Sequence, residues 1–109
     1  MASEVTLEKA VEELINAIKQ SEKYLEYRKQ LELINQEPDL KRQVDEFRKR
    51  NYEMQTSEDM DFGKLSRFQE EFKGLRENPL VDNFLAAELD FCKMMQNMNF
   101  SITEALDFE

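Results

Sequence analysis

The side chains with the most reactive chemistry are the sulfur-bearing residues near the C-terminus. Cys92 is the only cysteine of the chain, and Met94, Met95 and Met98 follow it closely. Thiolate and thioether ligands suit a soft metal such as Cu(I), but methionine fills gaps in cores and interfaces far more often. We therefore interpret this run as packing residues, and we predict no metal or cofactor site.

Catalytic side chains of the usual kinds are scarce. Histidine is absent, which removes Ser-His-Asp and Cys-His nucleophilic systems and the histidine-containing zinc motifs. Gly63 and Gly74 stand alone, without a glycine-rich phosphate loop. Carboxylate pairs such as Glu88 and Asp90 remain, but neighbouring helix positions point apart, and a chain with 24 acidic residues contains such pairs by chance. The sequence thus predicts no catalytic residue and no enzyme.

The elements that must position any functional surface are helices. The chain has 109 residues, which is the size of one domain, and it contains two glycines and two prolines. So few turn-forming residues leave long helices as the simplest architecture. We predict a single all-α domain over residues 1–109, an elongated helical hairpin or bundle of four to six helices.

Hydrophobic spacing places the first helix at the N-terminus. Leu7, Val11, Leu14 and Ile18 recur at intervals of four, three and four residues, which is the stripe of a helix that buries one face. Ser21 interrupts this register. It either caps a new helix or faces water inside one continuous helix.

Later helix boundaries follow from proline and capping residues. Pro38 fits the first turn of a helix, as does Pro79, which Asn78 precedes as a capping residue. Residues 55–61 lack an apolar period, so they are the candidate bend between two halves of the molecule. Residues 101–104 match a capping box and predict a short terminal helix. Between the bend and Asn78, helical spacing returns at Leu65, Phe68, Phe72 and Leu75.

The net charge argues against one class of partner. The chain carries 24 acidic and 15 basic residues, a formal net charge of −9. Nucleic-acid affinity comes largely from Lys and Arg that neutralise phosphates, so we predict no direct nucleic-acid binding. Residues 58–109 carry 12 acidic and 5 basic residues, whereas residues 1–57 carry 12 and 10. The acidic half is either a docking surface for a basic partner or a solvated surface that aids solubility.

One basic patch lies in the second quarter of the chain. We interpret it as a solvated helix face that pairs with nearby acids such as Asp45, Glu46 and Glu53. Its members are Lys41, Arg42, Arg48, Lys49 and Arg50.

The lack of a recognisable targeting signal predicts a cytoplasmic protein. The first residues show no signal-peptide pattern, and no apolar run approaches the roughly 20 residues of a membrane span. We therefore expect no membrane insertion.

Residues 72–100 contain more large apolar side chains than one helix face can hold. A single hairpin shields one face of each helix, so a second apolar face favours packing against another chain, most simply a second copy. The alternative is a compact bundle with this helix at its centre. We predict self-association through an interface formed by Phe84, Leu85, Phe91, Met94, Met95 and Met98.

Several short motifs together resemble one known family. In order, they are Leu14-x-x-Ala17-Ile18-x-x-Ser21-x-x-Tyr24-x-x-Tyr27, Glu37-Pro38-Asp39-Leu40, Asn78-Pro79-Leu80-Val81 and Phe84-Leu85-Ala86-Ala87-Glu88. Their order and spacing resemble the YlbF/YmcA family of small bacterial helical regulatory proteins, over nearly the whole chain.

This resemblance implies an oligomeric all-helical protein without catalysis of its own. Family members modulate RNase Y-dependent mRNA processing as part of a protein complex, and thereby competence, sporulation and biofilm formation. Some members of that complex share iron–sulfur clusters. Such a cluster usually needs four ligands, so Cys92 alone does not hold one, and sharing across an oligomer stays open. The alternative function is a structural or chaperone-like helical oligomer that shields apolar client segments.

Overall fold

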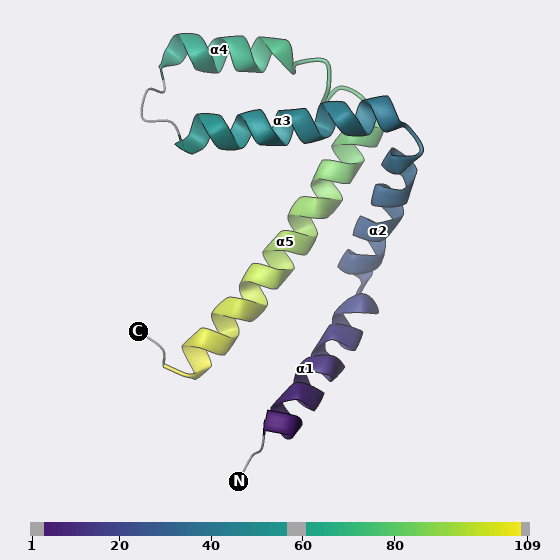
Figure 1. The fold of residues 1–109 in the computed structure, drawn as a ribbon, viewed down its shortest axis with the longest axis vertical. Coiled ribbons are helices and arrows are strands. Elements are labelled where there is room, and N and C mark those ends of the chain that lie inside the picture. The colour runs from purple at the N-terminus through teal and green to yellow at the C-terminus, as the bar shows by residue number, and fades with distance from the viewer. Residues whose placement is uncertain (1–3, 57–60, 108–109) are drawn as a thin grey trace. The chain divides into compact units, whose positions relative to one another are not determined.

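The computed structural model describes residues 4–56 and 61–107. These residues form five helices and no strand (Figure 1). The helices are α1 (Glu4–Lys19), α2 (Glu22–Asn35), α3 (Pro38–Thr56), α4 (Phe62–Glu71) and α5 (Pro79–Ala105). This confirms the all-α class and the predicted range of four to six helices. No described helix has both the length and the apolar character that crossing a membrane requires.

Local capping rules set the helix starts that the sequence predicted. Pro38 and Pro79 are the first residues of α3 and α5. The backbone N–H of Leu80 donates to Asn78 Oδ1 at 2.9 Å, so Asn78 caps α5 as expected.

Ser21 separates α1 from α2 and caps both. Its hydroxyl donates to the carbonyl oxygen of Ile18 at 2.6 Å and accepts from the backbone N–H of Tyr24 at 3.2 Å. Of the two interpretations of Ser21, the structure therefore shows the helix cap rather than a residue inside one continuous helix.

The predicted bend between two halves of the molecule, at residues 55–61, lies partly outside the described residues, at 57–60. It does not separate two halves: residues 30–86 form one compact unit, because Phe47 of α3 packs against Phe68 of α4, and the chain divides near residues 29/30 and 86/87 instead.

On the far side of residues 57–60, Asp61 is the N-cap of α4 and accepts from the backbone N–H of Lys64 at 2.7 Å. The helix ends at Glu71, earlier than the spacing Leu65 to Leu75 indicates. Residues 72–77 form turns instead, and Leu75 is still buried there.

The predicted terminal helix after Ser101 is wrong. α5 continues unbroken through residues 101–104 to Ala105. A capping box acts only where the chain enters a helix, because its side chains replace missing backbone partners. Ser101 lies inside a helix that has already formed, and Thr103 donates its hydroxyl to the carbonyl oxygen of Phe100 at 3.0 Å instead.

The chain divides into two compact units. We call residues 30–86 the central unit, and residues 1–29 with 87–109 the terminal unit. The central unit has a hydrophobic core, in which Phe47 packs against Phe68 and Phe72 with ring centroids 5.5 Å away in each case. The core residues with less than 2% exposure are Ile34, Val44, Val81 and Phe84.

The terminal unit is much more open. Ala87 is its one buried hydrophobic residue among those described, and α1 has no buried residue. An aromatic contact lies within it: Phe91 of α5 stacks on Tyr27 at 5.5 Å between ring centroids and meets Tyr24 at 5.4 Å. These ring contacts join α5 to α2.

Candidate interaction surfaces

The apolar face of α1 is exposed. Leu7, Val11 and Leu14 keep 66%, 46% and 41% of their surface accessible, although their spacing is that of a helix with one buried face. Ile18, the last residue of the stripe, is half-buried. An amphipathic helix gains its stability in proteins mainly from packing that face. Nothing in the described chain covers this one.

The C-terminal half of α5 faces α1 across an apolar groove within the terminal unit. Figure 1 shows the two helices running in opposite directions. The groove has a volume of about 490 Å³, and we call it the α1–α5 groove. Its lining residues are Leu14, Lys23, Met94, Asn97, Met98, Ser101 and Ile102.

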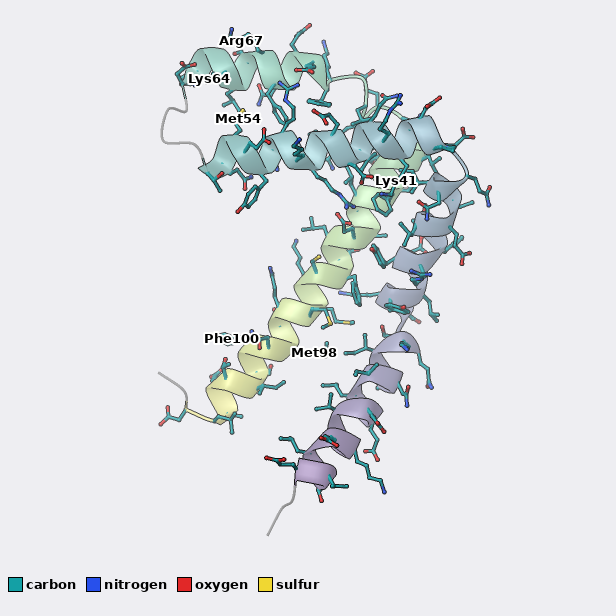
Figure 2. All side chains as sticks on the ribbon, viewed as in Figure 1. Lys41, Met54, Lys64, Arg67, Met98 and Phe100 are labelled. Atoms are coloured by element: carbon teal, nitrogen blue, oxygen red, sulfur yellow. The ribbon has the colours of Figure 1, made fainter. Side chains whose placement is uncertain are left out.

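Three of the six predicted interface residues lie at or beside this groove. Met94 and Met98 line it and are half-buried. Met95, one position along from Met94, is 40% exposed. Phe100 is more exposed still, at 66%, but projects from the opposite side of α5 to Met98 (Figure 2).

The structure places the other three elsewhere. Phe91 is half-buried against the two tyrosines of α2. Phe84 and Leu85 belong to the central unit, where Phe84 is 1% exposed and the Arg48 guanidinium carbon lies 5.0 Å from its ring centroid. The chain itself therefore covers Phe84, while the assignment of all six residues to an intermolecular interface stays a prediction.

Cys92 lies on α5 and is exposed. Among the described residues, no group of three or more Cys, Asp or Glu side chains is arranged to hold a metal ion. Cys92 is therefore not part of such a group in the part of the chain that the structure describes.

The basic patch of α3 makes the pairs expected of a solvated face only in part. Lys41 pairs with Asp45 one turn later, with 2.7 Å between Lys41 Nζ and Asp45 Oδ1. Arg50, by contrast, pairs with Glu71 of α4. That carboxylate raises the pKa of Arg50 above its ordinary value, first through the hydrogen bond and then through its charge.

Arg50 and Glu71 also line a second groove, which lies within the central unit between α3 and α4. We call it the α3–α4 groove, and its volume is about 420 Å³. Met54 projects from α3 toward α4, the helix that carries Lys64 and Arg67 (Figure 2). The lining residues are Arg50, Glu53, Met54, Lys64, Arg67, Phe68 and Glu71.

Sequence reasoning missed Lys64 and Arg67 as members of a surface. Lys64, Arg67, Phe68 and Glu71 recur at intervals of three, one and three residues, which places them on one face of a helix. That spacing is a signal for a mixed cationic and apolar face. The spacing within α4 does not reveal which face of α3 lies across the groove from it.

The chain has distant relatives among curated proteins. It is 22% identical over 101 residues to a UPF0342 protein of Caldicellulosiruptor bescii, which covers 89% of this chain and 85% of that protein. It is 24% identical to a UPF0342 protein of Caldicellulosiruptor saccharolyticus over the same share of this chain and 84% of that protein. No solved structure matches the chain.

A family match covers almost the whole chain, at residues 7–107. It includes α1 from residue 7 onward, the whole central unit, most of the terminal unit and the helix starts at Pro38 and Pro79. The family is a regulatory one, described as controlling the competence regulator ComK. The chain therefore belongs to the YlbF/YmcA family, as the motifs of its sequence indicated.

Proposed function

We propose that this protein is a non-catalytic regulatory factor of the cytoplasm that acts by binding other proteins, beginning with a second copy of itself. Like the family members it resembles, it would act in an RNase Y-associated complex that adjusts mRNA processing. Membership of a regulatory family supports this proposal, and so does the surface of the terminal unit.

The observation that carries the proposal is the exposed apolar surface of the terminal unit. Eleven large hydrophobic residues there are between 40% and 71% exposed, and Ala87 is its one buried hydrophobic residue among those described. Five of the eleven lie on the α1 stripe or at or beside the α1–α5 groove: Leu7, Val11, Leu14, Met95 and Ile102. Monomeric proteins rarely expose large apolar patches, and such patches commonly mark interaction sites. The unit has the amphipathic helices of a bundle without the helices that would complete it.

A second copy is the simplest partner that completes the bundle. In a two-fold arrangement each α1–α5 groove would receive the apolar face of the other copy, because a two-fold axis brings the same patch of both chains together.

Sedimentation of two matched variants tests this self-association. Met95→Glu places a charge beside the α1–α5 groove and should lower the particle mass to that of one chain, with helical content retained. Phe100→Glu introduces the same charge at a more exposed position, on the side of α5 opposite Met98, and it should leave the mass unchanged. Phe91 is a poorer test, since a charge there would also break its packing on Tyr24 and Tyr27.

The regulatory part is tested in the source cell. Replacing the gene with the Met95→Glu variant should alter the same processed transcripts as deleting it, whereas Phe100→Glu should not. If wild type and Met95→Glu both sediment as one chain, self-association is wrong. If the protein suppresses aggregation of unrelated proteins without a complex of fixed stoichiometry, the chaperone-like alternative replaces the regulatory one.

A further inference from the structure

The α3–α4 groove combines an apolar floor with a cationic rim. Phe68 is 8% exposed and Met54 is half-buried, and together they form the floor. Lys64 and Arg67 stand one turn apart on α4, are exposed, and form the rim. The Nε atom of Arg67 donates to the carbonyl oxygen of Gly63 at 3.2 Å, which holds the guanidinium in place.

The charges of this groove differ in sign from those of the whole chain. Among the described residues, its lining holds three cations, Arg50, Lys64 and Arg67, against two carboxylates, Glu53 and Glu71, which gives these residues a net charge of +1. The chain as a whole carries −9. Arg50 and Glu71 neutralise each other in their ion pair, so Glu53 is the carboxylate that remains opposite Lys64 and Arg67 among the described lining residues.

We propose that the α3–α4 groove binds an acidic protein segment that carries an apolar side chain between its carboxylates. The apolar side chain would pack on Met54 and Phe68, and the carboxylates would lie against Lys64 and Arg67. Cβ atoms at i and i+3 of a helix lie about 5–6 Å apart, so the spacing of these two cations suits acids on one face of a short helix or on alternate residues of a strand.

The groove suits a peptide better than a nucleic acid. Lys64 and Arg67 together offer only two phosphate contacts, whereas the affinity of a nucleic acid comes from neutralising many phosphates. An apolar floor between charges is, in contrast, the arrangement expected for a protein interface, with a packed centre and a polar rim. This inference goes beyond the proposed function, because it concerns the central unit and names the chemistry of a partner other than a second copy.

A peptide-binding measurement on the full chain tests it. The probe is a fluorescein-labelled heptapeptide of alternating Glu and Leu with a central Phe, and its binding is followed by fluorescence anisotropy. A peptide with Gln in place of every Glu should bind roughly tenfold more weakly, and binding of the acidic peptide should weaken as salt rises from about 0.05 M to 0.5 M.

Charge-reversal variants locate the site. Lys64→Glu and Arg67→Glu should each weaken binding of the acidic peptide by roughly fivefold, since attraction becomes repulsion at the rim. Lys64→Glu also places an acid in the first turn of α4, where the helix dipole favours it, so its unfolding temperature should not fall. Lys93→Glu makes the same change in the terminal unit and should leave binding unaltered.

Three outcomes would overturn the inference. They are equal binding of the Gln and Glu peptides, wild-type affinity in both rim variants, and tighter binding of a twelve-nucleotide oligouridylate than of the acidic peptide. The Met95→Glu variant separates this inference from self-association, because it should bind the peptide as wild type does whatever its particle mass.

Discussion

The two units of this chain use similar helices but bury very different amounts of apolar surface. Among the described residues, six of the seven buried hydrophobic side chains lie in the central unit. Eleven of the fourteen exposed large hydrophobic side chains lie in the terminal unit. The central unit resembles a small folded domain, and the terminal unit resembles one side of an interface.

The difference shows what an amphipathic pattern does and does not establish. α1 has a regular apolar stripe yet no buried residue, while α3, with five basic residues, buries Val44 completely. Periodicity indicates that a face should be covered, because exposed apolar surface is unfavourable. It does not indicate whether the same chain or another one covers it.

The largest expected effect follows from the core of the central unit. Phe84→Ala should lower the free energy of unfolding by about 3–5 kcal/mol, since it leaves a cavity among fully buried neighbours. Urea unfolding at low protein concentration measures it. Leu106→Ala, at a position that is 71% exposed in the terminal unit, is the matched truncation and should change stability by less than about 0.5 kcal/mol. Equal losses would contradict the contrast between the units.

A second substitution should act on association rather than on the core. Val11→Glu puts a charge in the middle of the α1 stripe and should weaken self-association by about 2 kcal/mol, the size of a central interface residue. Sedimentation at several concentrations measures this change. Val5→Glu is the control on the same helix, away from the stripe. If both variants raise the dissociation constant equally, the α1 stripe is not part of the interface.

Local rules made most helix boundaries predictable from the sequence. Pro38, Pro79 and Asn78 act within their own turns, so their roles do not depend on the rest of the chain. Ser101 shows the limit of such rules. Its neighbours match a capping pattern, but the preceding residues already supply the hydrogen bonds of a continuous helix, and the pattern then has no function.

The candidate surfaces were less predictable, because they depend on contacts between distant segments. Phe84 and Met95 belong to the same helix and the same apolar pattern, but one is 1% and the other 40% exposed. Likewise Arg50 meets Glu71, which is 21 positions away in the sequence, and this pairing of α3 with α4 creates the second groove. The spacing of residues within one helix does not indicate which other helix forms the second wall of a groove.

A smaller effect is expected where α1 meets α2. Ser21→Ala removes the acceptor of the Tyr24 N–H and the donor to the Ile18 carbonyl, and should cost about 1 kcal/mol. Hydrogen exchange should be faster at the first amides of α2 and unchanged at the start of α4. Asp61→Ala is the matched loss of a cap in the central unit and should speed exchange at the start of α4 instead. Faster exchange in both helices with either variant would mean that the two units open together.

The smallest effect concerns the turn between α4 and α5. A Cβ atom at Gly74 meets nothing within 4 Å, and its φ is not in the left-handed region. Gly74→Ala should therefore stabilise the central unit by about 0.4–1 kcal/mol, by restricting the unfolded chain. The gain in unfolding temperature should be the same at every protein concentration, and it should add to the effect of Val11→Glu, since the two residues belong to different units and the effects of independent sites add. A gain that disappears in the Val11→Glu background would show that the central unit depends on the partner that covers the terminal one.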